Sequence, residues 1–278
     1  MKRPILPIAL LLGAPCAFFL AFFLAPMFVV ALASLTGANG GVSVANYERI
    51  LLDRYHWDVL ILTFKLAFLT TLLCSLLGYP LAYYLVRNVS SRMLRRVFVI
   101  LLILPLFTSN IVRSFGWIVL LGRRGLLNDS LLTSGLIDTP IRLLGTETGI
   151  LIGLVYVHLP FIVLTVGNAV GKVDRSLENA ARDLGAGRAA TFWTVTFPLC
   201  LPGLLAGAIM VFTLSVSAYV TPALLGGGRI TMFSMLIFQQ YSSVFDFHYG
   251  GALSCTLLVL TLLMVAAANR VGAIRRAA

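Results

Sequence analysis

Long apolar runs are the feature that most constrains this chain. Six stretches are long and apolar enough to cross a lipid bilayer: 7–34, 59–86, 97–121, 148–170, 199–222 and 249–269. Hydrophobic residues make up 59% of the 278 and charged residues only 11%, against roughly 25% charged in a soluble domain. We therefore predict an all-α integral membrane protein with about six transmembrane helices, forming a single transmembrane domain over 1–278.

Two of these stretches contain helix breakers. Pro105 interrupts the third and Pro222 the fifth. A broken helix is tolerated in a membrane where neighbouring helices or a water-filled path satisfy the freed backbone groups. The first stretch follows Met1-Lys2-Arg3 and is longer than the core of a cleavable signal peptide, so we expect a retained first helix.

Basic residues are divided unevenly between the two sets of loops. One set, with both termini, has 13 basic and three acidic residues: Lys2, Arg3, Arg87, Arg92, Arg95, Arg96, Lys172, Arg175, Arg182, Arg188, Arg270, Arg275, Arg276, Asp174, Glu178 and Asp183. The other set has six and seven: Arg49, Arg54, Arg123, Arg124, Arg142, Arg229, Glu48, Asp53, Asp58, Asp129, Asp138, Glu147 and Asp246. The positive-inside rule places both termini in the cytoplasm. An even number of crossings agrees with this, because it leaves both termini on the same side. Topology thus explains the net charge of +11, and we expect no nucleic-acid partner.

Two further cations fall inside apolar stretches. Lys65 lies near the outer end of its stretch and can extend outward to water. Arg113 lies deeper, after Pro105. A charge at such depth indicates either a functional site or a structural cation paired with backbone carbonyls at a broken helix.

The sequence predicts no catalytic site, metal site or cofactor. It has no G-x-x-x-x-G-K-[ST] phosphate loop and no G-x-S-x-G elbow. The glycines of 226–228 lack the following lysine and favour a flexible turn. The three histidines are scattered: His56, His158 and His248. The four cysteines show no metal-type spacing, so we interpret them as apolar packing residues: Cys16, Cys74, Cys200 and Cys255.

The loop over 171–198 is the most informative part of the chain. Asp174 or Ser176 can cap the start of a short helix, and Gly185 suits the position after its end, where φ is often positive. One face of that helix is apolar and rich in alanine: Leu177, Ala180, Ala181 and Leu184. The charged residues Arg175, Glu178, Arg182 and Asp183 are expected elsewhere on its surface. Such a helix fits a partner's groove. The alternative, a helix lying on lipid, would favour large aromatic residues, which follow only at Phe192 and Trp193.

The loop also carries a motif with fixed spacing. Asn179-Ala180-Ala181 is followed by Gly185 and then by Val195, Thr196, Phe197 and Pro198. This resembles the signature of the ABC-importer permeases, which reads Glu-Ala-Ala, three residues, Gly, nine residues, Ile, any residue, Leu-Pro. The spacing matches throughout. The material departure is Asn179, which removes a carboxylate that commonly helps to anchor the loop; Glu178 beside it lies about 100° away around the helix.

The resemblance extends over nearly the whole chain. It looks closest to the B-type permeases of spermidine/putrescine importers, through residues 105–113, 137–142, 153–161 and 218–227. It implies the type I ABC importer permease (MetI-like) fold in a bacterial inner membrane. The implied partners are two cytoplasmic ATPases, a second and different permease, and a periplasmic solute-binding protein. Residues 176–187 would be the coupling helix, with these residues at the ATPase: Leu177, Glu178, Asn179, Ala180, Ala181, Asp183, Leu184 and Gly185.

We expect polar and aromatic residues near the helix breaks to line the translocation path, although each could instead hold helices together: Asn110, Arg113, Tyr156, His158, Ser215, Ser217, Tyr219 and Thr221. A polyamine would favour carboxylates and aromatic faces, yet no Asp or Glu lies well inside a predicted span. Either the binding protein supplies the selectivity, or the solute is an anion or zwitterion.

Other functions account for fewer of these features. A secondary transporter driven by an ion gradient usually shows ionisable groups near the midplane and internal repeats, and the sequence shows neither. A membrane-embedded enzyme would need clustered His, Asp or Glu at one face. A simple channel would not need the ordered loop over 171–198.

Overall fold

The computed structural model describes residues 13–36 and 41–277, with side chains as far as Arg270. Within these residues the regular secondary structure is helical, apart from one isolated β-bridge between Thr36 and Val42. The elements, with η marking 3-10 or π segments, are η1 (Leu20–Leu24), α2 (Ala25–Ser34), α3 (Ala45–Leu52), α4 (Arg54–Arg87), α5 (Arg92–Ile103), η2 (Leu104–Phe107), α6 (Asn110–Leu121), α7 (Leu126–Thr133), α8 (Glu147–Lys172), α9 (Arg175–Asp183), α10 (Arg188–Thr191), η3 (Phe192–Thr196), α11 (Phe197–Val216), α12 (Val220–Leu225), α13 (Phe233–Gln239), η4 (Gln240–Val244) and α14 (Phe247–Ala277).

The prediction of about six membrane spans is confirmed. In the described part of the chain, five helices are long and apolar enough to cross a bilayer, and a bent pair can supply a sixth. The five are Gly13–Ser34, Arg54–Arg87, Glu147–Lys172, Arg188–Val216 and Phe247–Arg270. Residues 7–12 of the first predicted span lie outside the described residues. The fifth span begins at Arg188, earlier than predicted, because α10, η3 and α11 run on without a break.

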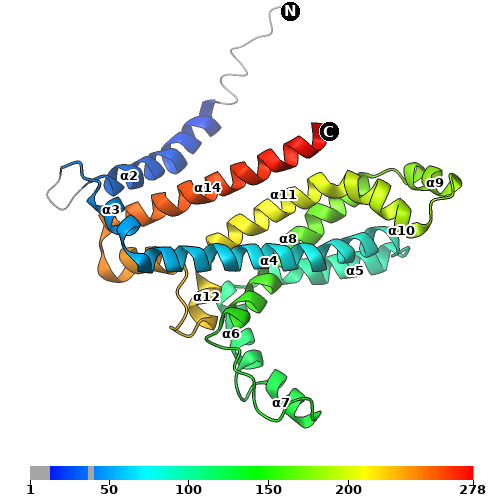
Figure 1. The fold of residues 1–278 in the computed structure, drawn as a ribbon, viewed down its shortest axis with the longest axis horizontal. Coiled ribbons are helices and arrows are strands. Elements are labelled where there is room, and N and C mark those ends of the chain that lie inside the picture. Colours follow the sequence, from blue (N-terminus) through cyan, green and yellow to red (C-terminus); the bar gives the residue numbers. More distant parts are fainter. Residues whose placement is uncertain (1–12, 37–40, 278) are drawn as a thin grey trace, which may run out of the picture. The chain divides into compact units, whose positions relative to one another are not determined.

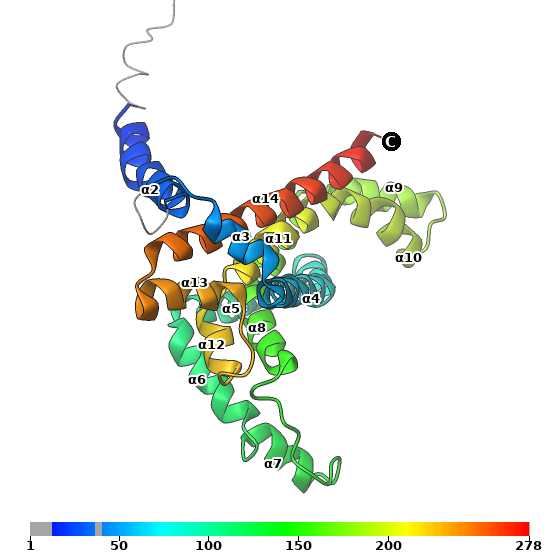
Figure 2. The ribbon, with the colours of Figure 1, turned by 60° about the vertical axis from the view of Figure 1, so that its left-hand side comes forward.

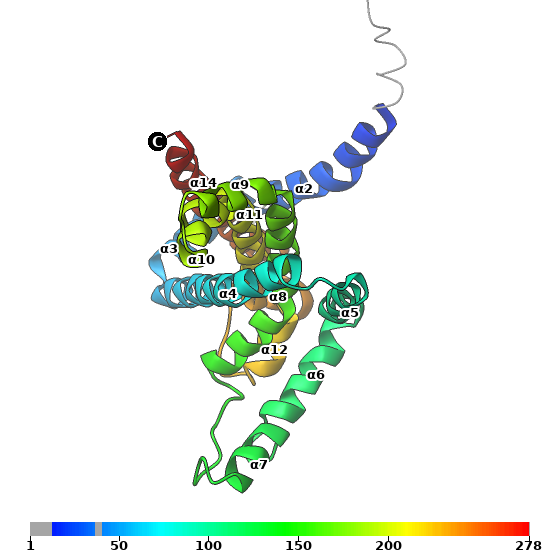
Figure 3. The ribbon, with the colours of Figure 1, turned by 90° about the vertical axis from the view of Figure 1, so that its right-hand side faces the viewer.

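The third span is broken, as Pro105 predicts. The segments Arg92–Phe107 and Asn110–Thr133 meet at 102° (Figure 3). Pro105 lies in the 3-10 segment η2, and Thr108 is extended. The side-chain oxygen of Ser109 then accepts the amide proton of Ile111 (3.3 Å) and starts α6.

The chain divides into two compact units, residues 1–58 with 235–262 and residues 59–234 with 263–278. In the first unit, α3 is tied to its neighbours by polar contacts. The hydroxyl of Tyr47 lies 2.7 Å from that of Ser34. The guanidinium of Arg49 lies over the ring of Tyr249, 4.5 Å from its centre, and the Tyr249 hydroxyl lies 2.6 Å from Nε2 of buried His56.

The core of the second unit is formed mainly by α4, α8 and α11. In Figure 1, α8 runs beside α11 and crosses α4. Thr146 caps α8 by accepting the amide proton of Gly149 (3.3 Å). Glu147 in the first turn and Lys172 in the last complement the helix dipole. Buried aliphatic residues on α8 pack into this core: Ile162, Val163, Val166 and Val170.

Two glycines of α11, Gly203 and Gly207, allow α8 and α11 to approach closely. A Cβ added at Gly207 would lie 2.2 Å from Oγ1 of Thr165, and one added at Gly203 would lie 2.4 Å from Cβ of Ala169. Neither space can hold a side chain. Small residues at helix contacts are typical of membrane proteins, where close packing replaces the hydrophobic effect between helices.

The fifth span ends in a break before Pro222. The helix α11 stops at Val216, and α12 begins at Val220 and packs against α6 (Figure 2). The hydroxyl of Ser234 donates to the carbonyl of Ala218 (2.6 Å), which satisfies a backbone group that the break leaves out of the helix. The two interrupted spans therefore meet at their breaks.

We expect Gly207→Val to destabilise the protein by about 1–3 kcal/mol, because the added side chain forces α8 and α11 apart. The measurement is the thermal unfolding midpoint of the detergent-solubilised protein. Gly116→Val is the matched control, since a Cβ at Gly116 on α6 meets nothing within 4 Å. An unchanged midpoint for the Gly207 variant would show that this helix contact is not tightly packed.

Candidate functional site

The helix α9 has a cap at each end. The carboxylate of Asp174 accepts the amide proton of Ser176 (2.9 Å). Gly185 follows the last turn with φ of +88°. The amides of Gly185 and Ala186 donate to the carbonyls of Arg182 (2.8 Å) and Ala181 (3.0 Å). These are the two hydrogen bonds of a Schellman cap, so a helix of only nine residues has both ends fixed.

The apolar residues of α9 are only partly covered by the described chain. Leu177 is 48% exposed and Leu184, at the end of the helix, is 89% exposed. The remaining predicted coupling residues, apart from Glu178, are exposed or half-buried: Asn179, Ala180, Ala181, Asp183 and Gly185. Exposed leucines on a rigid, capped helix form a surface suited to contact with another protein.

Glu178 is placed differently from the prediction, which put it among the surface charges. Its side chain is only 8% exposed, and Oε1 lies 2.9 Å from Nη2 of Arg87 at the end of α4. The hydroxyl of Thr196 in η3 donates to the same oxygen (2.9 Å). Glu178 therefore faces inward, because a buried cation and a hydroxyl donor lie behind α9. Asn179 faces outward.

A polar pocket of about 240 Å³ lies where the two broken spans meet. Five predicted path residues line it together with apolar residues: Asn110, His158, Ser217, Tyr219 and Thr221. They come from the start of α6, the middle of α8, and the break between α11 and α12. The breaks thus bring together polar side chains that are far apart in the sequence.

The other path candidates lie around this pocket without lining it. Arg113 donates to the side-chain oxygen of Asn110 one turn away on α6. The hydroxyl of Ser215 lies 3.2 Å from Nδ1 of His158, and both side chains are buried. The Tyr156 ring packs edge-on against Trp117, with centroids 5.3 Å apart. Arg113 and Ser215 orient pocket residues, whereas Tyr156 holds α8 against α6.

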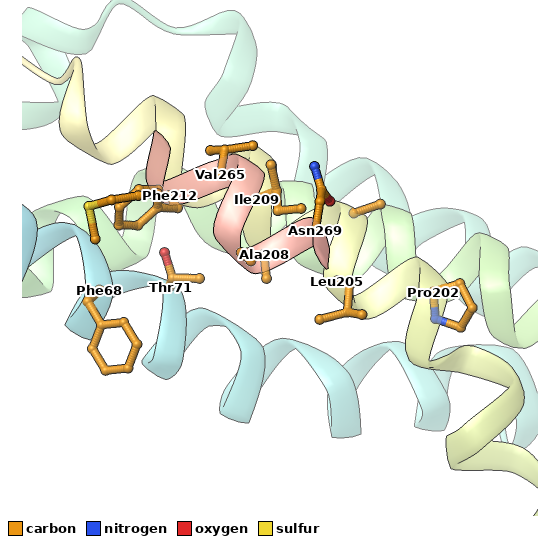
Figure 4. Close-up of a pocket in the computed structure, with 12 residues that line it drawn as sticks. Phe68, Thr71, Pro202, Leu205, Ala208, Ile209, Phe212, Val265 and Asn269 are labelled. Carbon is orange, nitrogen blue, oxygen red and sulfur yellow. The ribbon is translucent and has the colours of Figure 1, made fainter. Parts of the chain in front are cut away.

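A second pocket, of about 430 Å³, has a different character. Figure 4 shows its walls, formed by Phe68 and Thr71 of α4, Leu205, Ala208, Ile209 and Phe212 of α11, and Val265 and Asn269 of α14. Thr71 and Asn269 are its polar side chains. An almost wholly apolar wall offers a charged solute few hydrogen bonds, so the smaller polar pocket is the better candidate for a solute path.

Sequence reasoning missed the two inner partners of Glu178. In the sequence, Arg87 is one of many basic loop residues, and Thr196 occupies the position of the signature that accepts any residue. The sequence feature that indicates an inner anchor is Glu178 itself. A carboxylate one position before the signature glutamate suggests that the anchoring group has moved to a neighbouring face of the helix.

Comparison with known proteins agrees with this geometry. The family described as "Binding-protein-dependent transport system inner membrane component" matches residues 75–271. The spermidine/putrescine transport system permease protein PotB of Escherichia coli (strain K12) is 37% identical over 220 residues, covering 79% of each chain. PotB of Haemophilus influenzae is 32% identical over 253 residues, covering 88% of this chain and 86% of the relative.

A solved structure shows the same fold. It is a crystal structure of a bacterial ABC transporter involved in the import of the acidic polysaccharide alginate. Its chain superposes with a TM-score of 0.79 at 18% identity, covering 97% of this chain and 96% of that one.

Ser176 forms hydrogen bonds with the carboxylate of Asp174, first through its backbone amide and then through its side chain. These bonds hold the pKa of Asp174 below the usual 3.8. A carboxyl whose pKa is lower in the folded state stabilises that state above its ordinary pKa, and the effect is lost as the pH falls through the folded value. We therefore expect the start of α9 to exchange amide hydrogens faster as the pH is lowered from about 5 to about 2, after correction for intrinsic exchange. Asp174→Asn, which can still cap but does not titrate, should remove this pH dependence; an identical dependence would show that another group controls the cap.

Proposed function

This chain belongs to the family of binding-protein-dependent transport system inner membrane components and is the permease subunit of an ATP-binding-cassette importer, and from that premise we propose how it couples and what it carries. The whole of 1–278 acts as one transmembrane permease domain. ATP is hydrolysed in separate partner chains. Two cytoplasmic ATPases, a second and different permease, and a periplasmic solute-binding protein complete the importer, with lipid around the spans.

The coupling segment is α9 with its flanking turns, residues 176–187. The observation that carries this proposal is the pair of exposed leucines, Leu177 and Leu184, on a helix whose ends are both capped. A rigid helix loses little conformational entropy on binding. Small residues between the leucines, Ala180 and Ala181, let a groove in the ATPase approach closely. This surface therefore suits a permanent partner.

The orientation follows from charge. The loops that share a side with α9 hold most of the basic residues, so we place α9 and both termini in the cytoplasm. The match to an inner membrane component supports placing the chain in a bacterial inner membrane as a multi-pass protein. This orientation places α9 where the ATPases are.

ATP binding would close the ATPase pair and move α9 between two positions. The transmembrane helices would follow, opening the path to one side of the membrane or to the other. Such coupling is a bias between two states, so its strength depends on how differently the ATPase holds α9 in each state.

The proposed solute is spermidine, putrescine or a related amine. Support comes from the printed function of relatives 37% and 32% identical to this chain. The pocket offers aromatic and hydroxyl groups, with Tyr219 and Ser217 among them, but no carboxylate. Selectivity for a cation would then come from the binding protein, while a weak site in the path releases the solute.

The alternative is a secondary transporter. Its coupling ion would need an ionisable carboxyl group near the midplane. In the described residues, Asp58 and Glu147 lie within the first two turns of their spans, and Asp129 lies within the last two turns of the bent pair. The other acidic residues lie outside the spans. The family match to residues 75–271 favours the importer.

Disruption of α9 should separate the permease from its ATPase. Ala181→Glu places a charge in the apolar face, and Gly185→Val forces a β-branched side chain into a left-handed conformation that such residues rarely adopt. We expect each to weaken ATPase binding at least about thirtyfold, as loss of a central contact of about 2 kcal/mol does, while the protein still inserts. Co-purification with the ATPase is the measurement.

Two control variants accompany this experiment. Gly185→Asn keeps a residue that tolerates positive φ, and Ala190→Glu adds the same charge at an exposed position of α10. Both should retain the ATPase. Normal assembly of the two disruptive variants would show that α9 is not the docking site.

Filling the polar pocket should block transport without affecting assembly. Ser217→Trp projects an indole into a pocket of about 240 Å³, and we expect uptake of labelled spermidine by the reconstituted importer to fall at least about tenfold. Val119→Trp is the control, because Val119 lies on α6 and is 70% exposed. Equal uptake in the two variants would place the path elsewhere.

A further inference from the structure

One carboxylate joins three elements at the inner side of α9. Arg87 ends α4, Glu178 lies in α9, and Thr196 ends η3, directly before α11. Arg87 Nη2 lies 2.9 Å from Oε1 of Glu178, and the Thr196 hydroxyl donates to that same oxygen, also at 2.9 Å. The end of α4 and the start of α11 therefore hold α9 through a single side chain.

Arg87 also holds the segment that leads into α9. The same Nη2 atom donates to the backbone carbonyl of Val173 (2.9 Å). Val173 is buried, and the next residue is the cap, Asp174. The guanidinium thus fixes both the start of α9 and a position one turn into it, which restricts translation and tilt of the helix relative to α4.

The surroundings make this arrangement sensitive to loss of one partner. The side chains of Arg87 and Glu178 are each 8% exposed. Buried apolar residues from α4 and from the approach to α9 lie in the same core: Tyr79, Leu85, Val89 and Val173. Removing one member of a buried ion pair leaves the other charge without compensation, whereas neutralising both is far better tolerated.

The position of this carboxylate also accounts for Asn179. The signature has its glutamate at the position of Asn179, which is exposed here. Glu178 lies one residue earlier and faces inward. The anchoring carboxylate is therefore inside the chain, and the outward position carries a neutral amide.

We propose that Arg87, Glu178 and Thr196 form a joint that makes α9 move as one body with the ends of α4 and α11. The three are positioning residues, and none needs to touch the solute or ATP. This inference rests on the proposed function, in which movement of α9 drives the spans. Without the joint, the ATPase would tilt α9 on its flanking turns and the movement would be lost before it reached the path.

The first test needs no partner protein. In the full-length permease in lipid nanodiscs, Glu178→Gln should raise hydrogen exchange in the amides of α9 roughly tenfold, because it leaves the Arg87 charge uncompensated. Arg87→Gln combined with Glu178→Gln should bring exchange back toward the wild-type rate. Glu147→Gln is the matched control: it removes the same charge from the Lys65–Glu147 pair (2.6 Å), whose side chains are 51% and 43% exposed, and should leave α9 unchanged.

Thr196→Val supplies a milder change should Glu178→Gln fail to insert. It removes only the hydroxyl donor, and we expect exchange in α9 to rise several-fold. Unchanged exchange in every variant that inserts, or an equal rise with Glu147→Gln, would overturn the joint.

The second test measures transmission. In the reconstituted importer, Glu178→Gln or Thr196→Val should co-purify with the ATPase as the wild type does but move fewer solute molecules per ATP hydrolysed. An unchanged ratio alongside faster exchange would contradict transmission through the joint. A wild-type chain that binds no ATPase would instead contradict the proposed function, while the exchange experiment would still decide whether the joint holds α9.

Discussion

The inner side of α9 is fixed by the Glu178 carboxylate, and the rest of the site depends on that contact. A nine-residue helix is too short to be stable alone in water. Its caps at Asp174 and Gly185 satisfy the ends, but only the buried pair with Arg87 determines which face turns outward. Because Glu178 points inward, Leu177 and Leu184 are left exposed. One interaction thus sets both the anchorage of α9 and the surface that it offers to a partner.

The two broken spans are the second structural constraint on this chain. Backbone that leaves a helix within a membrane must find partners in the protein or in a water-filled cavity. In this chain, Ser109 caps α6 after one break, and Ser234 bonds to Ala218 at the other. Both breaks open onto one polar pocket that also reaches His158. Close packing at Gly207 holds together α8 and α11, two of the helices that line the pocket.

Much of this could be predicted from the sequence, because it depends on local physics. Apolar run length gave the spans, Pro105 the break in the third, and Gly185 the end of α9. The sequence position of Glu178 indicates an anchoring carboxylate, but the direction of its side chain and its partners could not be predicted, because Arg87 and Thr196 approach it only when α4 and η3 pack together. The meeting of path residues in one pocket depends likewise on tertiary packing, although each was identified by its type and its nearness to a helix break.

In the proposed importer, α9 presents its exposed face to a cytoplasmic ATPase. The most direct measurement is the labelling of Leu184→Cys, with Cys16 replaced by serine, using a membrane-impermeant maleimide on vesicles of known orientation. We expect the cysteine to be labelled rapidly and from the cytoplasmic side only, since Leu184 is 89% exposed. We also expect strong protection from labelling when the ATPase is bound. Labelling from the outside, or an undiminished rate with the ATPase bound, would contradict this placement of α9.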